Sequence, residues 1–217
     1  MLLIGLRSLM QLPLSPADVV NDGRARPIGN PLRRRQHLAG RALLRELLGH
    51  WPGVDPTTEI RARPGQAPML PAWPSLQLSV SHSGALVAAA VADQPVGIDV
   101  EEPRIGRDLS ALARWSMDEV EYAAWAALPP AQRTSAFYRS WTAKEAAYKA
   151  SARTQAGLAW LAIEAATDSG AELASWALPP DGACWLSVCS PALKRLHIVV
   201  AEPELPENAS LYRLRGG

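Results

Sequence analysis

Between residues 76 and 101, hydrophobic and polar positions alternate as they do in short β-strands. The first part of this stretch has an apolar side chain at every second position, namely Leu76, Leu78 and Val80. This period of two predicts a strand with one buried face, followed after a turn at Ser83-Gly84 by a second, apolar strand over 85–92. Alternation resumes over 96–101, which predicts a third strand ending before Pro103.

Two other stretches have apolar residues at helical spacing. Over 33–49 leucines and alanines recur three or four positions apart, and most of the arginines lie off that stripe. This pattern predicts an amphipathic helix with a basic surface. A second helix is expected from about Ala131 to Ala150. Ser116 and Glu119 have the spacing of a capping box, so a further helix is expected to begin there.

Proline divides the chain into short elements. It occurs 19 times in 217 residues, about twice its average usage. We expect loops at Pro27–Pro31, Pro64–Pro74, Pro103, Pro129–Pro130 and Pro179–Pro180. Short strands are expected over 185–188 and 196–200. The chain is thus predicted to mix α and β elements, without an internal repeat.

Composition and charge exclude several classes of protein. Lys and Arg total 22 against 21 Asp and Glu, a net charge of +1, so nothing global favours binding to nucleic acid or an anionic membrane. The longest apolar run, 85–92, is too short to span a bilayer. Arg7 interrupts the apolar start Met1–Leu14, which favours a strand of a cytoplasmic protein over a signal peptide. Cys184 and Cys189 are too few for a disulfide framework or a zinc site and are expected to be buried or half-buried thiols.

Asp99 and Glu101 form the first feature that can carry chemistry. They stand two positions apart on the predicted third strand, so both carboxylates point to one face, roughly 6.5 to 7 Å apart along the chain. Two hard oxygen ligands in one space could hold a divalent cation. The alternative is an ordinary solvated strand face.

A row of side chains on the predicted helix is the second feature. Trp141, Glu145 and Lys149 are four positions apart and therefore lie in line on one helix face. Lys144 points to another face. The alternative is an exposed Glu–Lys pair of little energetic weight.

The third feature is His82 between small residues. Ser81, Ser83 and Gly84 beside it would let a phosphate approach an imidazole, hydroxyls and backbone amides. The alternative is a structural histidine. No G-x-S-x-G elbow accompanies it, which argues against a serine hydrolase.

Taken in order, these features resemble the motif set of the phosphopantetheinyl transferases of the surfactin-synthetase-activator type. The motifs are Ser81-His82-Ser83, Gly97-Ile98-Asp99-Val100-Glu101, and Trp141-Thr142-Ala143-Lys144-Glu145-Ala146 with Lys149. Arg33-Arg34 and 38–44 also resemble the basic helix of the bacterial holo-acyl-carrier-protein synthase members.

The resemblance implies an α+β fold built as a pseudo-dimer. Two similar halves, 1–103 and 104–217, would each pack a small antiparallel sheet on a helix and meet at a cleft that holds coenzyme A. The implied activity transfers 4′-phosphopantetheine from coenzyme A to a serine of an apo carrier protein, with an acyl carrier protein favoured. We expect a cytoplasmic monomer with neither nucleic acid nor membrane as a partner.

The resemblance also implies roles for individual residues. Asp99, Glu101 and Glu145 would bind Mg²⁺, Glu145 would take the proton of the carrier serine, and Lys149 would stabilise the departing phosphate. The residues expected at coenzyme A are His82, Ser81, Ser83, Lys144 and the candidates for its 3′-phosphate, Arg33, Arg34, Arg35 and Arg41.

Two positions depart from the family pattern. Ala67 stands where the family usually has a lysine, and Gln36 where it has an arginine, so coenzyme A binding is expected to lose a cation. Three alternatives stay open at this point: a non-catalytic coenzyme A or nucleotide-binding protein, which the lost lysine would favour, a metal-dependent phosphodiesterase, and a module that only binds carrier proteins.

Overall fold

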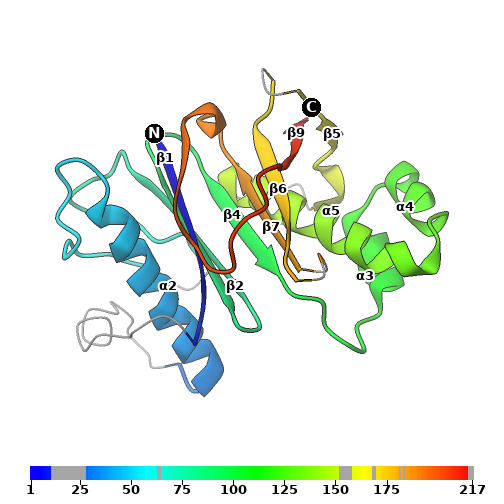
Figure 1. The fold of residues 1–217 in the computed structure, drawn as a ribbon, viewed down its shortest axis with the longest axis horizontal. Coiled ribbons are helices and arrows are strands. Elements are labelled where there is room, and N and C mark those ends of the chain that lie inside the picture. Colours follow the sequence, from blue (N-terminus) through cyan, green and yellow to red (C-terminus); the bar gives the residue numbers. More distant parts are fainter. Residues whose placement is uncertain are drawn as a thin grey trace.

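A computed structural model describes residues 1–10, 28–62, 65–151, 158–167, 170–180, 182 and 184–214. Within these residues the chain forms two β-sheets and four α-helices, a mixed α+β fold. Figure 1 shows α2 (Pro31–Gly49) beside one sheet and α5 (Pro130–Ala150) beside the other, with α3 (Leu109–Ser116) and α4 (Glu119–Ala126) at the far end of α5.

The first sheet has the strand order β2-β3-β1-β8. Its strands are β2 (Gln77–Ser83), β3 (Leu86–Ala92), β1 (Leu2–Ser8) and β8 (Leu196–Ala201). All pairs are antiparallel except β1 with β8, which is parallel. Helix α2 (Pro31–Gly49) covers one face through its leucines, because Leu43, Leu44 and Leu47 are fully buried against this sheet.

The second sheet has the strand order β4-β7-β6-β9-β5 and is antiparallel throughout. Its strands are β4 (Gly97–Glu101), β7 (Cys184–Cys189), β6 (Leu173–Leu178), β9 (Ser210–Leu214) and β5 (Ile163–Ala165). Helix α5 (Pro130–Ala150) packs on its outer face through the small side chains Ala143, Ala146 and Ala147, which allow a close approach.

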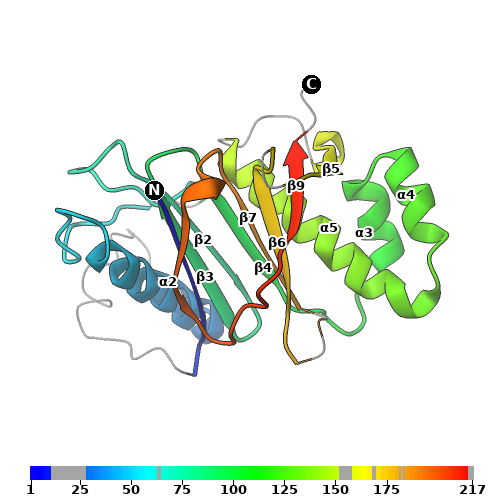
Figure 2. The same ribbon diagram turned by 45° about the horizontal axis from the view of Figure 1, so that its top comes forward.

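The main core lies where the two sheets face each other. It combines Ile4, Leu6, Ala88 and Ala90 of the first sheet with Ile98, Val100, Trp176, Leu186 and Val188 of the second. The order of layers is therefore helix, sheet, sheet, helix, which Figure 2 shows from α2 on the left to α5 on the right. The edge strands β2 and β4 come into contact at one border of the two sheets.

The predicted helices over 33–49 and 131–150 are confirmed as α2 and α5, and the predicted strands as β2, β3, β4, β7 and β8. The strand expected near the start is β1, and the part of Met1–Leu14 beyond residue 10 lies outside the described residues, as do Pro27 and Pro64. Neither cysteine forms a disulfide, and Cys189 is buried while Cys184 is half-buried. Burial raises the pKa of the Cys189 thiol to about 12.

The predicted capping box at Ser116 and Glu119 is wrong. Ser116 is the last residue of α3 (Leu109–Ser116), where its hydroxyl donates to the Leu112 carbonyl. The capping box of α4 (Glu119–Ala126) pairs Asp118 with Glu121, which stand at the same spacing two positions later.

Two strands cross the predicted boundary near Pro103. Strand β4 precedes it but pairs in the second sheet, and β8 follows it but pairs with β1. The division into 1–103 and 104–217 stays a prediction. None of the helices in the described ranges is long and apolar enough to cross a membrane.

Candidate active site

Both predicted strand carboxylates are held by serine hydroxyls of β2. Ser81 Oγ donates to Asp99 Oδ1 over 2.6 Å, and Ser83 Oγ donates to Glu101 Oε2 over 2.8 Å. The period of two places both carboxylates on one side of β4 and both serines on the facing side of β2. The contact between the two sheets thus positions the acidic pair.

Asp99 is the most enclosed of the acidic residues at this border, with 4% of its surface exposed. Its Oδ1 also accepts from Lys149 Nζ over 2.7 Å. Its Oδ2 is buried and has no hydrogen-bond partner within the described part of the chain. Since a buried carboxylate oxygen without a partner is costly, this atom is suited to a ligand that carries positive charge.

The surroundings of Glu101 also favour a nearby cation. Burial raises the pKa of its carboxyl, and the neighbouring charge of Asp99 raises it further. A cation beside the two carboxylates would offset the negative charge of Asp99 that disfavours ionisation of Glu101. The donor set is therefore one of hard oxygens, which fits Mg²⁺.

Gly97 brings helix α5 onto β4. A Cβ at this position would lie 1.9 Å from the Ala146 carbonyl oxygen and 2.6 Å from the Ala150 nitrogen, so only glycine permits this crossing. The close approach lets Lys149 Nζ donate to the Ile98 carbonyl over 3.1 Å as well as to Asp99. Lys149 of the predicted row is thereby placed at the acidic pair.

The other members of the predicted row, Trp141 and Glu145, lie nearer the N-terminal end of α5 than Lys149 does. Glu145 is half-buried, and Trp141 packs with Phe137 and Trp115 at ring distances of 5.6 and 5.8 Å. Across the described ranges, no three His, Cys, Asp or Glu side chains gather closely enough to hold a metal ion as they stand. Glu145 as a third metal ligand stays a prediction.

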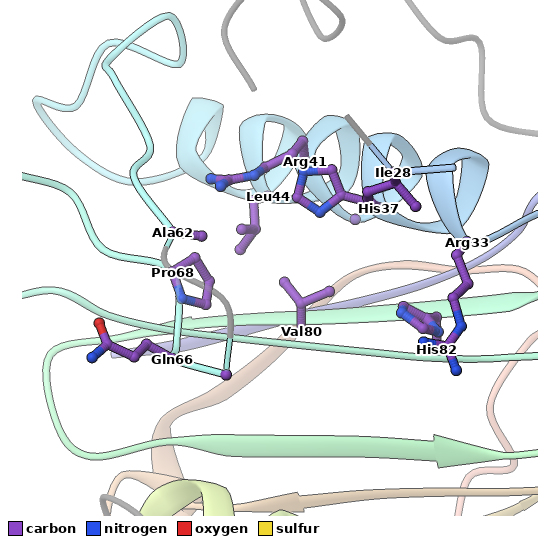
Figure 3. Close-up of a pocket in the computed structure, with 12 residues that line it drawn as sticks. Ile28, Arg33, His37, Arg41, Leu44, Ala62, Gln66, Pro68, Val80 and His82 are labelled. Atoms are coloured by element: carbon purple, nitrogen blue, oxygen red, sulfur yellow. The ribbon is translucent and has the colours of Figure 1, made fainter. Parts of the chain in front are cut away.

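A basic pocket of about 360 Å³ opens between α2, β2 and the loop before β2. Gly40 allows the helix and strand to approach, because a Cβ there would lie 2.8 Å from Val80 Cγ1. Figure 3 shows Arg33 and His82 at one end of the pocket and Gln66 at the other. The α2 side chains His37, Arg41 and Leu44 lie on the wall that faces Val80 of β2. Its cationic or titratable lining residues are Arg33, His37, Arg41 and His82.

His82 has the environment of an anion contact. Partial desolvation in the pocket lowers the pKa of its imidazole, and the charges of Lys149, Arg33 and His37 lower it further. A site that resists a further positive charge favours a negative one. An anion in this pocket would meet several cationic groups at once.

Of the arginines predicted for phosphate binding, Arg33 and Arg41 line the pocket. Arg34 is exposed and is not among the lining residues, and Arg35 donates to the Leu9 carbonyl over 3.1 Å. Gln36 is buried, and its Nε2 donates to the Gly84 carbonyl over 2.9 Å. Gln36 thus fixes the turn after His82 instead of supplying a cation.

Lys144 does not reach the pocket, so its assignment to coenzyme A needs correction. Its side chain is fully buried, and Nζ donates to the Ser116 carbonyl over 2.8 Å and to Glu121. One helical step separates it from Glu145, which turns it by about 100° onto the face that meets α3 and α4. Lys144 ties these helices to α5.

Two residues of the site were not singled out in the sequence. His37 lies on the pocket wall of α2, one turn after Arg33, and this spacing on a basic helix was the available signal. Glu102 accepts from the Ala85 nitrogen over 3.1 Å, and a Cβ on Gly84 would meet its Oε2. No periodic pattern marks Glu102, because it follows Glu101, the last residue of β4.

The acidic pair and α5 fall within residues 95–201, which match the family model described as the 4′-phosphopantetheinyl transferase superfamily. This part of the chain belongs to the superfamily. The sequence resemblance is thereby confirmed for the part of the chain that carries Asp99, Glu101, Glu145 and Lys149.

Curated relatives point to the same family. The chain is 37% identical over 126 residues to the 4′-phosphopantetheinyl transferase HetI of Nostoc sp., covering 55% of this chain and 53% of that protein. It is 35% identical over 129 residues to the 4′-phosphopantetheinyl transferase AcpT of Escherichia coli, covering 59% and 61%. A 4′-phosphopantetheinyl transferase of Bacillus subtilis is 32% identical over 113 residues, covering 52% and 50%. The chain thus spans about half the length of the curated relatives it matches.

Proposed function

We propose that this chain transfers 4′-phosphopantetheine from coenzyme A to a serine of an apo carrier protein, releasing adenosine 3′,5′-bisphosphate. The observation that carries the proposal is the unpartnered Oδ2 of Asp99 beside Glu101 and Lys149. This acidic site for a cation lies on the strand next to His82 and the basic pocket. A substrate with a pyrophosphate and a separate phosphate suits both parts.

The basic pocket is the proposed site for the nucleotide end of coenzyme A. Its volume of about 360 Å³ falls in the range of small-molecule sites. Arg33 and Arg41 supply guanidinium groups, which bind phosphate through two parallel hydrogen bonds. His82, at the end of the pocket nearest Ser83, is proposed to contact the phosphate groups that continue toward Asp99.

Asp99 and Glu101, with Glu145 as the proposed third ligand, would hold Mg²⁺ through carboxylate oxygens. When bound, the ion would neutralise charge on the pyrophosphate and polarise it toward attack. Glu145 is proposed to accept the proton of the carrier serine, which is a weak nucleophile as an alcohol. Lys149, which already donates to Asp99, is proposed to stabilise charge on the departing phosphate.

Ala67 lies close to this site. It lines a small pocket of about 60 Å³ together with Gln66, Ser79 and Lys149. The lysine usual in the family would therefore enter the space between the basic pocket and the acidic pair. We propose that its absence weakens coenzyme A binding and leaves the acidic pair unchanged.

We propose an acyl carrier protein or carrier domain as the partner, recognised by the surface that follows β4. Ile105 and Trp115 are exposed there, and each follows an exposed arginine, Arg104 and Arg114, in the sequence. Because carrier proteins are acidic, complementary charge would steer the encounter and raised salt should weaken it. We also propose that the two sheet-and-helix units correspond to the two similar halves of a cytoplasmic monomer.

Release of adenosine 3′,5′-bisphosphate tests the proposed function. Coenzyme A, Mg²⁺ and the protein are incubated with an apo carrier protein, and the nucleotide products are separated by chromatography. We expect product only when the carrier keeps its acceptor serine, with a carrier Ser→Ala variant as the control. If the protein binds coenzyme A but releases no product with any apo carrier, the non-catalytic alternative is favoured.

A further inference from the structure

Three serines of β2 face β4 in one row. Ser79, Ser81 and Ser83 stand two positions apart, and each has at most 8% of its surface exposed. Each hydroxyl bonds a different group of β4: Ser79 Oγ accepts from the Ile98 nitrogen, while the other two donate to the carboxylates. No backbone ladder joins β2 to β4 in the described sheets, so these hydroxyls make the polar contacts between the strands.

The chemistry of the partners fixes the direction of two of these bonds. An ionised carboxylate can only accept, so Ser81 and Ser83 must donate to Asp99 and Glu101. Ser83 Oγ at the same time accepts from the Glu102 nitrogen over 3.1 Å. This second bond holds its hydroxyl in place and leaves the proton directed at Glu101.

Each serine engages one oxygen of its carboxylate. Asp99 receives Ser81 and Lys149 on Oδ1, whereas its Oδ2 is the buried atom without a hydrogen-bond partner in the described chain. Glu101 receives Ser83 on Oε2. A carboxylate fixed through one oxygen has its rotamer set, and the other oxygen then points in one direction.

We propose that Ser81 and Ser83 are positioning residues, which orient Asp99 and Glu101 so that one oxygen of each is presented to a divalent cation. This inference rests on the proposed function for the cation itself. It assigns the two serines to the carboxylates, whereas the sequence placed them at coenzyme A. Because both hydroxyls are buried and already donate, contact with a phosphate would require these bonds to break.

Mn²⁺ affinity of the purified full chain, measured by calorimetry without coenzyme A or carrier, tests the proposal. Ser81→Ala and Ser83→Ala should each bind Mn²⁺ about 10- to 100-fold more weakly, the usual effect of losing a residue that orients a metal ligand. Ser81→Thr keeps a hydroxyl at this strand position, and its Mn²⁺ affinity should stay within a few-fold of that of the unaltered protein.

Ser175→Ala is the matched control. Ser175 is equally buried, but its hydroxyl pairs with Ser187 over 2.8 Å and contacts no carboxylate. It should bind Mn²⁺ as the unaltered protein does, and thermal melting of every variant shows whether it is folded. If Ser81→Ala does not fold, Ser83→Ala and Ser81→Thr carry the test.

The outcomes separate this inference from the proposed function. If the unaltered protein binds no Mn²⁺, the proposed metal site itself fails. If it binds Mn²⁺ and the folded alanine variants bind equally well, the positioning role is overturned. If Ser81→Ala and Ser83→Ala keep their Mn²⁺ affinity but bind coenzyme A more weakly, the two serines contact coenzyme A, and the positioning role is overturned.

Discussion

Gly97→Ala should separate the acidic strand from the helix that carries Lys149 and Glu145. The added Cβ would lie 1.9 Å from the Ala146 carbonyl oxygen and 2.6 Å from the Ala150 nitrogen, where ordinary contacts are well above 3 Å. Both obstacles are backbone atoms of α5, so no side-chain rotation relieves them. We expect a loss of about 3 kcal/mol in the free energy of unfolding, the upper part of the range for overpacking.

For a chain of 217 residues, this loss corresponds to a fall in Tm of about 6 to 12 °C. Turnover should fall by about 10²-fold even where the variant is folded, because an ångström of misplacement at a reacting centre has that effect. Differential scanning calorimetry and the nucleotide-release assay measure the two effects.

Gly49→Ala is the control for Gly97→Ala. It adds the same methyl group at the end of α2, where the nearest atom is 4.0 Å away, and it should change neither Tm nor turnover appreciably. An unchanged Tm for Gly97→Ala would mean that β4 and α5 are not in the close contact that the distances at Gly97 indicate.

Three further predictions concern single side chains. Glu101 has a raised pKa, so its contribution to stability is present below its ordinary pKa and is lost as pH rises through the raised value; Glu101→Gln should therefore raise the Tm of the metal-free protein at pH 7, and a lowered Tm there would contradict this. Ala67→Lys should add a charge-assisted phosphate contact of roughly 1.5 to 3 kcal/mol and lower the KM for coenzyme A at least several-fold, whereas an unchanged KM in steady-state kinetics would place residue 67 away from the phosphates. Lys144→Met removes a buried partner of Glu121 and should lower the free energy of unfolding by about 3 to 5 kcal/mol in calorimetry, with no change in the KM for coenzyme A; an altered KM would support contact of Lys144 with the substrate.

Local sequence patterns predicted the helices and strands but not which strands pair with one another. Alternation around Val80 and the leucine stripe of α2 arise from neighbouring residues, so the sequence alone reveals them. The pairing of β4 with β7 and of β1 with β8 joins segments far apart in the chain. The periodicity of hydrophobic residues does not show which distant strands pair, so a boundary predicted near Pro103 could not take this pairing into account.

The candidate site divides in the same way. The shared strand face of Asp99 and Glu101 follows from a period of two and was predictable. The contacts that Ser81 and Ser83 make depend on which strand lies opposite β2, and this comes only from the tertiary arrangement. Lys144 was expected on another face of the helix than Glu145, but its partners Ser116 and Glu121 belong to other helices, so its burial there also comes only from the tertiary arrangement.

Intact mass of an apo acyl carrier protein, after incubation with this protein, coenzyme A and Mg²⁺, tests the proposed transfer to a carrier serine. We expect a mass gain of one phosphopantetheine on the acceptor serine with the unaltered protein. With Glu145→Gln, which keeps the size of the side chain but removes the proposed base, we expect a rate lower by about 10²-fold or more. No mass gain across acyl, polyketide and peptide-synthetase carriers would contradict the proposed transferase function.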